Sequence, residues 1–413
     1  MKLILITNNY PFSYGEAFLE NERSYMPNFE DVIILPCKEK EFVNNREKGG
    51  NVRIYKSKDN IPNIMQKLLG CSRALFTLDV LKEIYSLLKK KSISINKIID
   101  LIFFKYDKTY KVKKFKKYLN QVGVNKNDKV IFYSYWLDNT AFIGIKLSRY
   151  YPFSTVISRA HRCDLYEEES KCGYIPFQKK NIEELDKIYC ISQDGRDYLK
   201  QKYPQNANKI MCSRLGTRDW GIEKYTGKTV LNIISCSYVV PVKRVHLIIE
   251  ILKEIKDIPI FWTHIGDGKE LGEIKRLSEG LPANISVSFM GQMENKEVIE
   301  NYKENEYHLF INVSESEGIP VSIMEATSFG IPVMATDVGG TRELVNDKTG
   351  ILLKKDFDIR SAVNAVREIY SKSDREYIEL RNRTRRFWVE NFYAQSNYFD
   401  FYKMVMRQKD KDL

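Results

Sequence analysis

The sequence contains no apolar run of about 18 residues, the length that a helix needs to cross a bilayer. Its start, MKLILITNNYPF, has an apolar run too short for a secretory signal and favours a first buried strand. The seven cysteines are scattered and never form a Cys-x-x-Cys pair, which argues against both a disulfide framework and a zinc site. We therefore expect a cytoplasmic protein that is soluble or peripheral at the inner face of the membrane.

The chain is long, and its apolar segments alternate in type. Its 413 residues exceed the size at which one core usually stops growing, which predicts two domains of roughly 200 residues. Strand-like runs alternate with helical stretches: KLILIT, DVIILP, KVIFYSYW, STVISRA and KIYCIS, then LNIISCS, IFWTHIG, ISVSFMG, HLFINVS and IPVMATD. This alternation predicts α/β domains with parallel sheets, and the continuously apolar runs predict strands covered by helices on both faces.

A polar stretch, KQKYPQNANK, interrupts the alternation near residues 200–210 and predicts the domain boundary. We assign residues 1–205 to an N-terminal domain and residues 206–382 to a C-terminal domain. The aromatic-rich tail, residues 383–413, is expected to be helical and to return to the first domain.

The net charge of +12 is concentrated in residues 89–117, which carry eleven lysines against Asp100 and Asp107. Isoleucine, leucine and phenylalanine are interleaved with these lysines, a mixture that suits an anionic membrane surface. The alternative is a solvated basic face over ordinary core residues. Nucleic acid is a weaker interpretation because no recognised nucleic-acid module accompanies the lysines, and we expect no nucleic-acid partner.

The stretch SESEGIPVSIMEA, residues 314–326, places a Gly-Ile-Pro turn between a strand and a helix. Pro320 is tolerated in a first helical turn, so the free N–H groups of Val321 and Ser322 would form a partial positive charge that attracts phosphate. Ligands of open α/β sheets bind at the carboxyl ends of strands, where this turn is expected.

Two glutamates flank that turn. Glu325 can accept hydrogen bonds from both hydroxyls of a ribose, and Glu317 can reach hydroxyls on the other side of a diphosphate. The alternative is a loop carboxylate and a helix-face carboxylate without a ligand.

The longer segment EGIPVSIMEATSFGIPVMATDVGGTRELV resembles the signature of the retaining GT-B glycosyltransferases of family 4, of the bacterial surface-polysaccharide type. Gly330, Pro332, Gly339, Gly340 and Glu343 match that signature in order and spacing. The resemblance implies a fold of two Rossmann-like, doubly wound domains facing a central cleft. It also implies transfer of a sugar from a nucleotide diphosphate, expected to be UDP, to a glycan or lipid-linked glycan. The turn residues Gly318, Ile319, Pro320, Val321 and Ser322 and the carboxylate of Glu325 would then bind the donor, and Glu317 would be catalytic.

Further segments of the second half resemble the same family. LNIISCSYVVPVKRVHLIIEIL places Lys243 where a lysine contacts the diphosphate, and Tyr238 stands where an arginine is usual. Arg244 stands where glycine is common and would replace the lost charge. The remaining donor-binding positions that the resemblance implies are the glycines of HIGDGKEL and the turn of FMGQMENKEVIENY: Gly266, Gly268, Gly291 and Met293.

In the first half, SRAHRCDLYEEE resembles the histidine-bearing loop of the family, which implies that His161 lies beside the transferred sugar and the β-phosphate. Asp164 would lie on the acceptor side; a structural histidine is the alternative. The loop TNNYPFSYGEAFLENE resembles the glycine-bearing loop that closes over diphosphate and acceptor, with Gly15 on the donor and Glu16 on an acceptor hydroxyl. A helix-start charge is the alternative for Glu16.

Sugar transfer needs charge stabilised on the departing phosphate, and Lys243, Arg244 and backbone N–H groups could supply this without a divalent ion. The Asp-x-Asp spacings, at Asp356 with Asp358 and at Asp410 with Asp412, lie outside the loops expected to line a cleft. We therefore predict transfer without a metal or other cofactor. Two alternatives stay open: a GT-B nucleotide-sugar epimerase, and a non-catalytic sugar-nucleotide-binding partner of another transferase.

Overall fold

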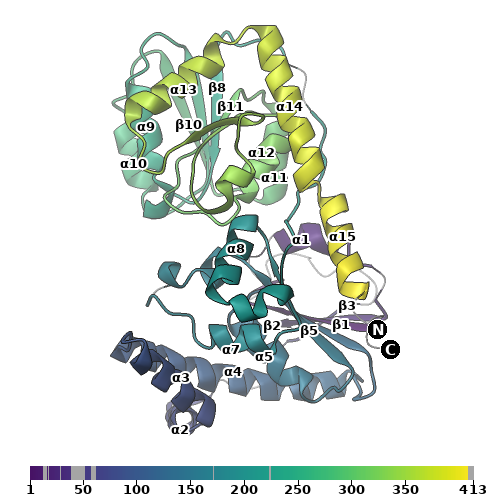
Figure 1. The fold of residues 1–413 in the computed structure, drawn as a ribbon. Coiled ribbons are helices and arrows are strands. Elements are labelled where there is room, and N and C mark those ends of the chain that lie inside the picture. Colours follow the sequence, from purple (N-terminus) through teal and green to yellow (C-terminus); the bar gives the residue numbers. More distant parts are fainter. Residues whose placement is uncertain are drawn as a thin grey trace. The chain divides into compact units, whose positions relative to one another are not determined.

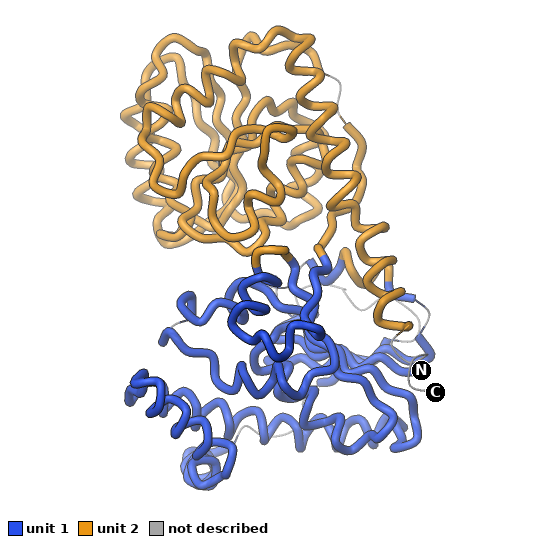
Figure 2. The backbone as a smooth tube through the Cα atoms, in the orientation of Figure 1, with its two compact units in different colours: residues 1–20, 26–191, 195–213 blue, residues 21–25, 192–194, 214–413 orange. Residues whose placement is uncertain are grey.

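The computed structural model of the protein describes residues 1–12, 16, 18–27, 29–38, 52–56, 62–170, 172–222 and 225–407. These residues form two compact units (Figure 2). Unit 1 comprises residues 1–20, 26–191 and 195–213, and unit 2 comprises residues 21–25, 192–194 and 214–413. Each unit contains one parallel sheet with flanking helices (Figure 1).

The sheet of unit 1 has seven strands in the order β3-β2-β1-β4-β5-β6-β7, and every neighbouring pair is parallel. The strands are β1 (Lys2–Thr7), β2 (Asp31–Pro36), β3 (Val52–Ile54), β4 (Val130–Ser134), β5 (Ser154–Ala160), β6 (Lys187–Cys190) and β7 (Ile210–Cys212). Every residue of β1 and β4 is buried, as expected for central strands of a covered parallel sheet.

Helices connect these strands, and three of them lie between β3 and β4. The helices are α1 (Phe18–Arg23), α2 (Ile64–Leu75), α3 (Leu78–Lys89), α4 (Ile95–Gln121), α5 (Asn139–Ser148), α6 (Arg162–Leu165), α7 (Gln178–Glu184) and α8 (Gln193–Lys202), with 3-10 turns at Glu167–Glu169 and Pro204–Lys209. Ser94 starts the long helix α4 because its hydroxyl accepts the N–H of Lys97.

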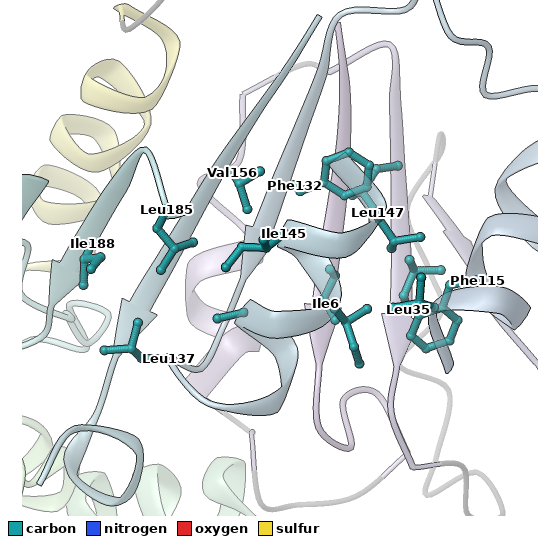
Figure 3. Close-up of a cluster of buried hydrophobic side chains, with 14 of the residues drawn as sticks. Ile6, Leu35, Phe115, Phe132, Leu137, Ile145, Leu147, Val156, Leu185 and Ile188 are labelled. Carbon is teal, nitrogen blue, oxygen red and sulfur yellow. The ribbon is translucent and has the colours of Figure 1, made fainter. Parts of the chain in front are cut away.

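The core of unit 1 lies between the sheet and helices α4 and α5 (Figure 3). Ile6 and Phe132 from the sheet pack with Ile145 and Leu147 of α5 and with Phe115 of α4. This packing anchors the second half of α4 to the sheet.

The sheet of unit 2 has six parallel strands in the order β10-β9-β8-β11-β12-β13. The strands are β8 (Leu231–Cys236), β9 (Ile260–Ile265), β10 (Ile285–Gly291), β11 (Leu309–Asn312), β12 (Val333–Thr336) and β13 (Gly350–Leu353). Both sheets therefore contain the 3-2-1-4-5-6 strand order of a doubly wound Rossmann fold.

The helices of unit 2 include a long C-terminal pair that follows the last strand. They are α9 (Val245–Lys253), α10 (Leu271–Ser278), α11 (Asn295–Glu304), α12 (Val321–Ser328), α13 (Ile359–Ser371), α14 (Asp374–Phe392) and α15 (Ala394–Arg407), with 3-10 turns at Pro241–Lys243 and Gly339–Glu343. Helix α15 packs on residues 21–25: the Tyr402 hydroxyl donates to Glu22 at 3.1 Å and the Tyr398 ring stacks on Tyr25.

The ten strands expected from apolar runs are all present, and three further strands were not anticipated: β3, β7 and β13. Each of these three is an edge strand of three or four residues. The domain ranges 1–205, 206–382 and 383–413 stay predictions. Among the helices that the structure describes, none combines the length and the apolar character needed to cross a membrane.

Candidate functional site

In unit 2 the candidate residues gather after strands β8 and β11, which are neighbours in the sheet. The chain leaves β8 toward β9 on one side and leaves β11 toward β12 on the other. This is the topological switch point, where the carboxyl ends of parallel strands leave room for a ligand. The loop after β8 contains Lys243 and the loop after β11 contains Glu317.

The structure brings Lys243 and Glu317 together. The Lys243 Nζ lies 2.5 Å from Glu317 Oε1, and Asn312, the last residue of β11, donates its Nδ2–H to the same oxygen at 3.2 Å. Asn312 Oδ1 in turn accepts the N–H of Ser314 at 3.0 Å, which fixes the orientation of the amide. Lys243 is partly exposed while Glu317 is buried. The cation of this ion pair is therefore accessible, and the carboxylate is fixed by its donors.

Helix α12 starts directly after the turn that contains Gly318 and Ile319. Pro320 is the residue before the helix, and Val321 and Ser322 form its first turn, where N–H groups have no acceptor within the helix. The glycine turn at residues 339–340 closes on this segment, because Gly340 N–H donates to the carbonyl of Gly318 at 2.7 Å. A Cβ at Gly339, whose φ is +51°, would lie 2.0 Å from the Glu317 carbonyl oxygen, so only glycine fits there.

Glu325 is buried in α12, and its Oε1 accepts a hydrogen bond from Asn295 Nδ2 at 2.6 Å. Burial raises the pKa of the Glu325 carboxyl to about 7, and the hydrogen bond from Asn295 opposes that shift. Asn295 begins helix α11, directly after the turn that contains Gly291 and Met293. The hydrogen bond from Asn295 therefore joins the turn of Gly291 and Met293 to Glu325, all three of which were predicted to bind the donor.

Arg244 holds the backbone of the loop after β11. Its guanidinium donates to the carbonyls of Val313 at 2.7 Å, Ser314 at 3.2 Å and Lys355 at 3.1 Å. Its φ of +49° lies in the left-handed region, which glycine adopts without strain, and this explains why glycine can stand at this position. Tyr238, on the same loop, is 55% exposed. The phosphate contact expected of Arg244 stays a prediction.

The Gly-Asp-Gly turn after β9 packs against the backbone of the β8 loop. A Cβ at Gly266 would lie 1.9 Å from the Ser237 carbonyl oxygen, and one at Gly268 would lie 2.3 Å from that of Val239. Gly266 N–H also donates to the Gly291 carbonyl at 2.8 Å. These glycines let three loops approach closely, and a bulkier residue at either position would push them apart.

In unit 1, His161 follows β5 and lies among aromatic rings. Its ring centroid is 4.5 Å from that of Trp136, 5.0 Å from Tyr135 and 5.6 Å from Phe18. Burial, the nearby charge of Arg159 and a hydrogen bond to the Tyr135 backbone act on the imidazole, and burial dominates, lowering the pKa of His161 to about 3. The imidazole is therefore neutral at pH 7, and its buried Nε2 has no hydrogen-bond partner among the described residues.

Asp164 ties the loops after β4 and β5 together. Its two oxygens accept the N–H groups of His161 at 2.6 Å and Leu137 at 2.5 Å. The side chain is fully buried, and burial raises the pKa of the Asp164 carboxyl well above its usual range. Asp164 thus positions the backbone on which His161 sits; contact with an acceptor stays a prediction.

Glu16 has a structural role in the loop after β1. Its carboxylate accepts backbone N–H groups of Asn8 at 3.0 Å, Asn9 at 2.6 Å and Tyr10 at 2.5 Å, and also the indole N–H of Trp136. Only 1% of the residue is exposed. These donors occupy the carboxylate, and its expected contact with an acceptor hydroxyl stays a prediction. Gly15 lies outside the described residues.

Three residues at these sites were missed from the sequence: Asn295, Asn312 and Trp136. Each is recognisable only through its partner, since an asparagine at a strand end or helix start is common and carries no spacing signal. Trp136 was counted within the strand KVIFYSYW, whereas β4 ends at Ser134. Among the described residues no group of three or more His, Cys, Asp or Glu side chains is arranged to hold a metal ion.

Comparison with protein families agrees with this geometry. Residues 223–387, which lie within unit 2, match the model of the glycosyl transferases group 1. Over 273 residues the chain is 24% identical to the UDP-N-acetylglucosamine–peptide N-acetylglucosaminyltransferase GtfA subunit of Streptococcus pneumoniae, covering 63% of this chain and 51% of that protein. Over 203 residues it is 29% identical to the putative colanic acid biosynthesis glycosyltransferase WcaL of Escherichia coli, covering 47% and 50%. The chain thus spans about half the length of these two relatives.

Several solved structures resemble nearly the whole chain. The lipopolysaccharide outer core galactosyltransferase WaaB has a TM-score of 0.67 at 15% identity, over 98% of this chain and 99% of that one. Anabaena Alr3699/HepE in complex with UDP has a TM-score of 0.65 at 13% identity, over 98% and 100%. The fold is therefore that of the GT-B glycosyltransferases, with two Rossmann-like α/β domains.

Proposed function

We propose that this protein is a retaining glycosyltransferase of family 4 that moves a sugar from a UDP-sugar to a glycan or lipid-linked glycan in surface polysaccharide synthesis. The observation that carries the proposal is the Lys243–Glu317–Asn312 cluster beside the first turn of α12. It sets a cation and a helix N-terminus next to a fixed carboxylate, which are the groups that a sugar diphosphate requires.

The expected donor has support from the neighbouring structures. Anabaena Alr3699/HepE has been solved with UDP and with UDP-glucose, and the pneumococcal GtfA structure contains UDP and GlcNAc. The polysaccharide role is suggested by the names of the relatives, which include the colanic acid enzyme and an O-antigen biosynthesis glycosyltransferase of Escherichia coli.

In the proposed reaction Lys243 and the N–H groups of Val321 and Ser322 stabilise the charge that develops on the departing diphosphate. Glu317 orients hydroxyls of the donor sugar, and Glu325 accepts from the ribose. The acceptor oxygen attacks on the face of the leaving group, and the diphosphate takes its proton. The neutral imidazole of His161 offers its Nε2 lone pair to a sugar hydroxyl, because its pKa is held near 3.

The donor site can be tested by thermal-shift binding with UDP-, GDP-, ADP- and CMP-sugars in the absence of metal. We expect a shift with a UDP-sugar that disappears in Glu325→Ala. Equal thermal shifts for wild type and variant would show that Glu325 does not contribute to donor binding. No shift with any nucleotide in a folded protein would refute the donor assignment as a whole.

Two finer parts of the proposal need separate measurements. Activity unchanged by a chelator would support metal-independent transfer, and its loss in chelator would contradict it. An anomeric carbon with the same configuration in donor and product, determined by NMR of the product, would establish retention.

A second candidate function is non-catalytic binding of sugar nucleotides as a partner of another transferase. The exposed Tyr238 at the position of the family arginine favours it, because one phosphate contact is absent. Tight donor binding without turnover on any acceptor would support this candidate over the enzyme.

A further inference from the structure

Helices α2, α3 and the first half of α4 have large apolar side chains on their outward faces. The three helices pack on one another. The apolar residues that they leave exposed, between residues 64 and 103, are here called the 64–103 face. Large exposed apolar areas on a soluble fold mark interaction surfaces.

Helix α2 packs through small residues and turns its apolar side outward. A Cβ at Gly70 would lie 2.1 Å from the Tyr106 ring of α4, and Ala74, one turn later, is buried. At 100° per residue, Leu68 lies about 160° and Ile64 about 120° around the helix from Gly70. Ile64 is 78% exposed and Leu68 63%. Helix α2 thus exposes apolar side chains beyond those expected on the outer face of a surface helix.

Helix α3 is apolar on two sides. Val80 and Leu87 are buried in a cluster that includes Phe142 of α5. Leu81 and Tyr85, about 100° and 140° around the helix from Val80, are exposed. The core therefore accounts for only one of the two apolar sides.

Helix α4 changes character along its length. In its first half Ile95, Ile99 and Phe103 repeat every four residues and are exposed, while Leu101 is buried on the other side. In its second half the packed residues include Phe115. The apolar face is confined to the first half of the helix.

Several lysines of the 89–117 region are engaged within unit 1. Lys105 pairs with Asp79 at 2.5 Å, Lys111 lies 3.6 Å from Asp107, and Lys116 lies 3.5 Å from the centre of the Tyr150 ring. The second half of α4 therefore fits the solvated face over a core better than it fits a membrane surface. The exposed apolar residues lie toward the N-terminal end of the 89–117 region and before it.

The charges around the 64–103 face are mostly positive. Six exposed cations accompany it: Lys67, Arg73, Lys82, Lys89, Lys90 and Lys91. Asp100 is the exposed acid within residues 62–103, because Asp79 pairs with Lys105 and Glu83 accepts a hydrogen bond from the Tyr174 hydroxyl. Apolar side chains and cations on the same helices match an anionic lipid surface.

We propose that the 64–103 face docks on an anionic lipid bilayer, with its apolar side chains at the boundary between headgroups and acyl chains and its lysines at the lipid phosphates. The docking itself does not depend on the proposed function. Only its biological reason does, which is to hold the protein at a lipid-linked acceptor. Vesicle binding requires no donor and is measured independently of the donor thermal shift.

The test is sedimentation of the full chain with phosphatidylcholine vesicles, with and without phosphatidylglycerol, at low salt. We expect binding to the anionic vesicles that falls at least about tenfold in the variant Leu68→Gln/Leu81→Gln/Ile99→Gln. The matched control, Phe153→Gln/Phe399→Gln, changes two exposed apolar residues outside the face and should bind as wild type does.

A charge pair of variants separates the electrostatic part. Lys89→Gln/Lys90→Gln should weaken binding about tenfold or more at low salt, and the difference should shrink at high salt. The control Lys126→Gln/Lys129→Gln removes the same charge from exposed positions elsewhere in unit 1 and should have little effect.

Insertion can be detected at Phe76, which is 76% exposed at the corner between α2 and α3. Tryptophan emission from Phe76→Trp should be quenched by brominated lipids beyond the quenching of wild type, while Phe399→Trp should show no added quenching. All variants must keep the wild-type thermal midpoint and donor shift.

Three results would overturn the proposal. One is no binding to anionic vesicles by the folded wild type. Another is equal loss of binding in the face variants and their controls. The third is conversion of an oligomer to a monomer by the apolar variant with vesicle binding unchanged, which would make the face a contact between copies of this chain.

Discussion

The two units have the same strand order through six strands but different chemistry at their strand ends. In unit 2, Lys243 and Glu317 bring opposite charges together at the switch point. In unit 1, backbone N–H groups and an indole occupy Glu16, and His161 is a neutral ring among aromatics. We therefore expect unit 2 to bind a ligand with charge and unit 1 to bind uncharged hydroxyls.

The matches to known proteins also differ between the two units. The group 1 glycosyltransferase match covers residues 223–387, within unit 2, whereas the structural likeness to WaaB covers 98% of the chain. The shared fold therefore extends beyond the recognisable sequence.

The largest effect is expected from Lys243→Met. Loss of the cation beside the departing diphosphate should lower kcat by about 10²- to 10³-fold. Steady-state kinetics with the donor identified by thermal shift would measure it, and Lys243→Arg should recover part of the rate. A loss below threefold would mean that unit 2 does not use this charge and would break the contrast between the units.

A smaller effect is expected from His161→Ala, about tenfold or more in kcat, with the donor thermal shift retained. Because the pKa of His161 is near 3, the imidazole stays neutral from pH 5 to 9. The ratio of wild-type to variant kcat should therefore be constant over that range. An inflection of this ratio near pH 6 to 7 would show that His161 titrates, and unit 1 would then also use charge.

The third prediction concerns stability and Glu325. Its folded-state pKa of about 7 exceeds the ordinary value of 4.5. The native state thus binds the proton more tightly, and its stabilising contribution is fully present below pH 4.5 and is lost as pH rises through 7. Relative to Glu325→Gln, wild type should lose up to about 1.4 kcal/mol of unfolding free energy per pH unit within this window.

Denaturant unfolding of wild type and Glu325→Gln at several pH values between 4.5 and 8 provides this measurement. If the unfolding free energies of the two proteins change with pH in parallel, Glu325 is already ionised in the native state. Glu250→Gln, on the outer helix α9, is the matched control because Glu250 is exposed.

The smallest effect is expected from Tyr238→Arg, which restores the family arginine. The exposed position should tolerate the change within about 0.5 kcal/mol of stability. Binding of UDP should tighten about three- to tenfold through the added phosphate contact, measured by calorimetry. Unchanged or weaker binding would mean that the β8 loop holds this side chain away from the diphosphate.

Much of the fold could be predicted from the sequence because central strands of parallel sheets are continuously apolar. The runs KLILIT and DVIILP coincide with β1 and β2 residue for residue. The edge strands β3, β7 and β13 were missed because three or four residues with one partner strand leave too short a pattern.

The candidate site was predictable where a motif fixed spacing and unpredictable where a partner came from elsewhere in the chain. Lys243 and Glu317 were both identified, but their ion pair joins residues 74 positions apart. Glu16 illustrates the opposite case: the resemblance to a glycine-bearing loop implied an acceptor contact, which stays a prediction, but it did not reveal that N–H groups of the same loop donate to the carboxylate.

The closure of Gly339 and Gly340 on residues 317–318 has a consequence for exchanging parts between related proteins. The two segments lie 22 residues apart in sequence, yet Gly340 donates to Gly318 and Gly339 leaves no room for a Cβ beside Glu317. A chimaera that imports only the turn before α12 would meet a foreign glycine turn on its other side. A transplanted segment must therefore include at least residues 317–340 to keep both sides of this closure.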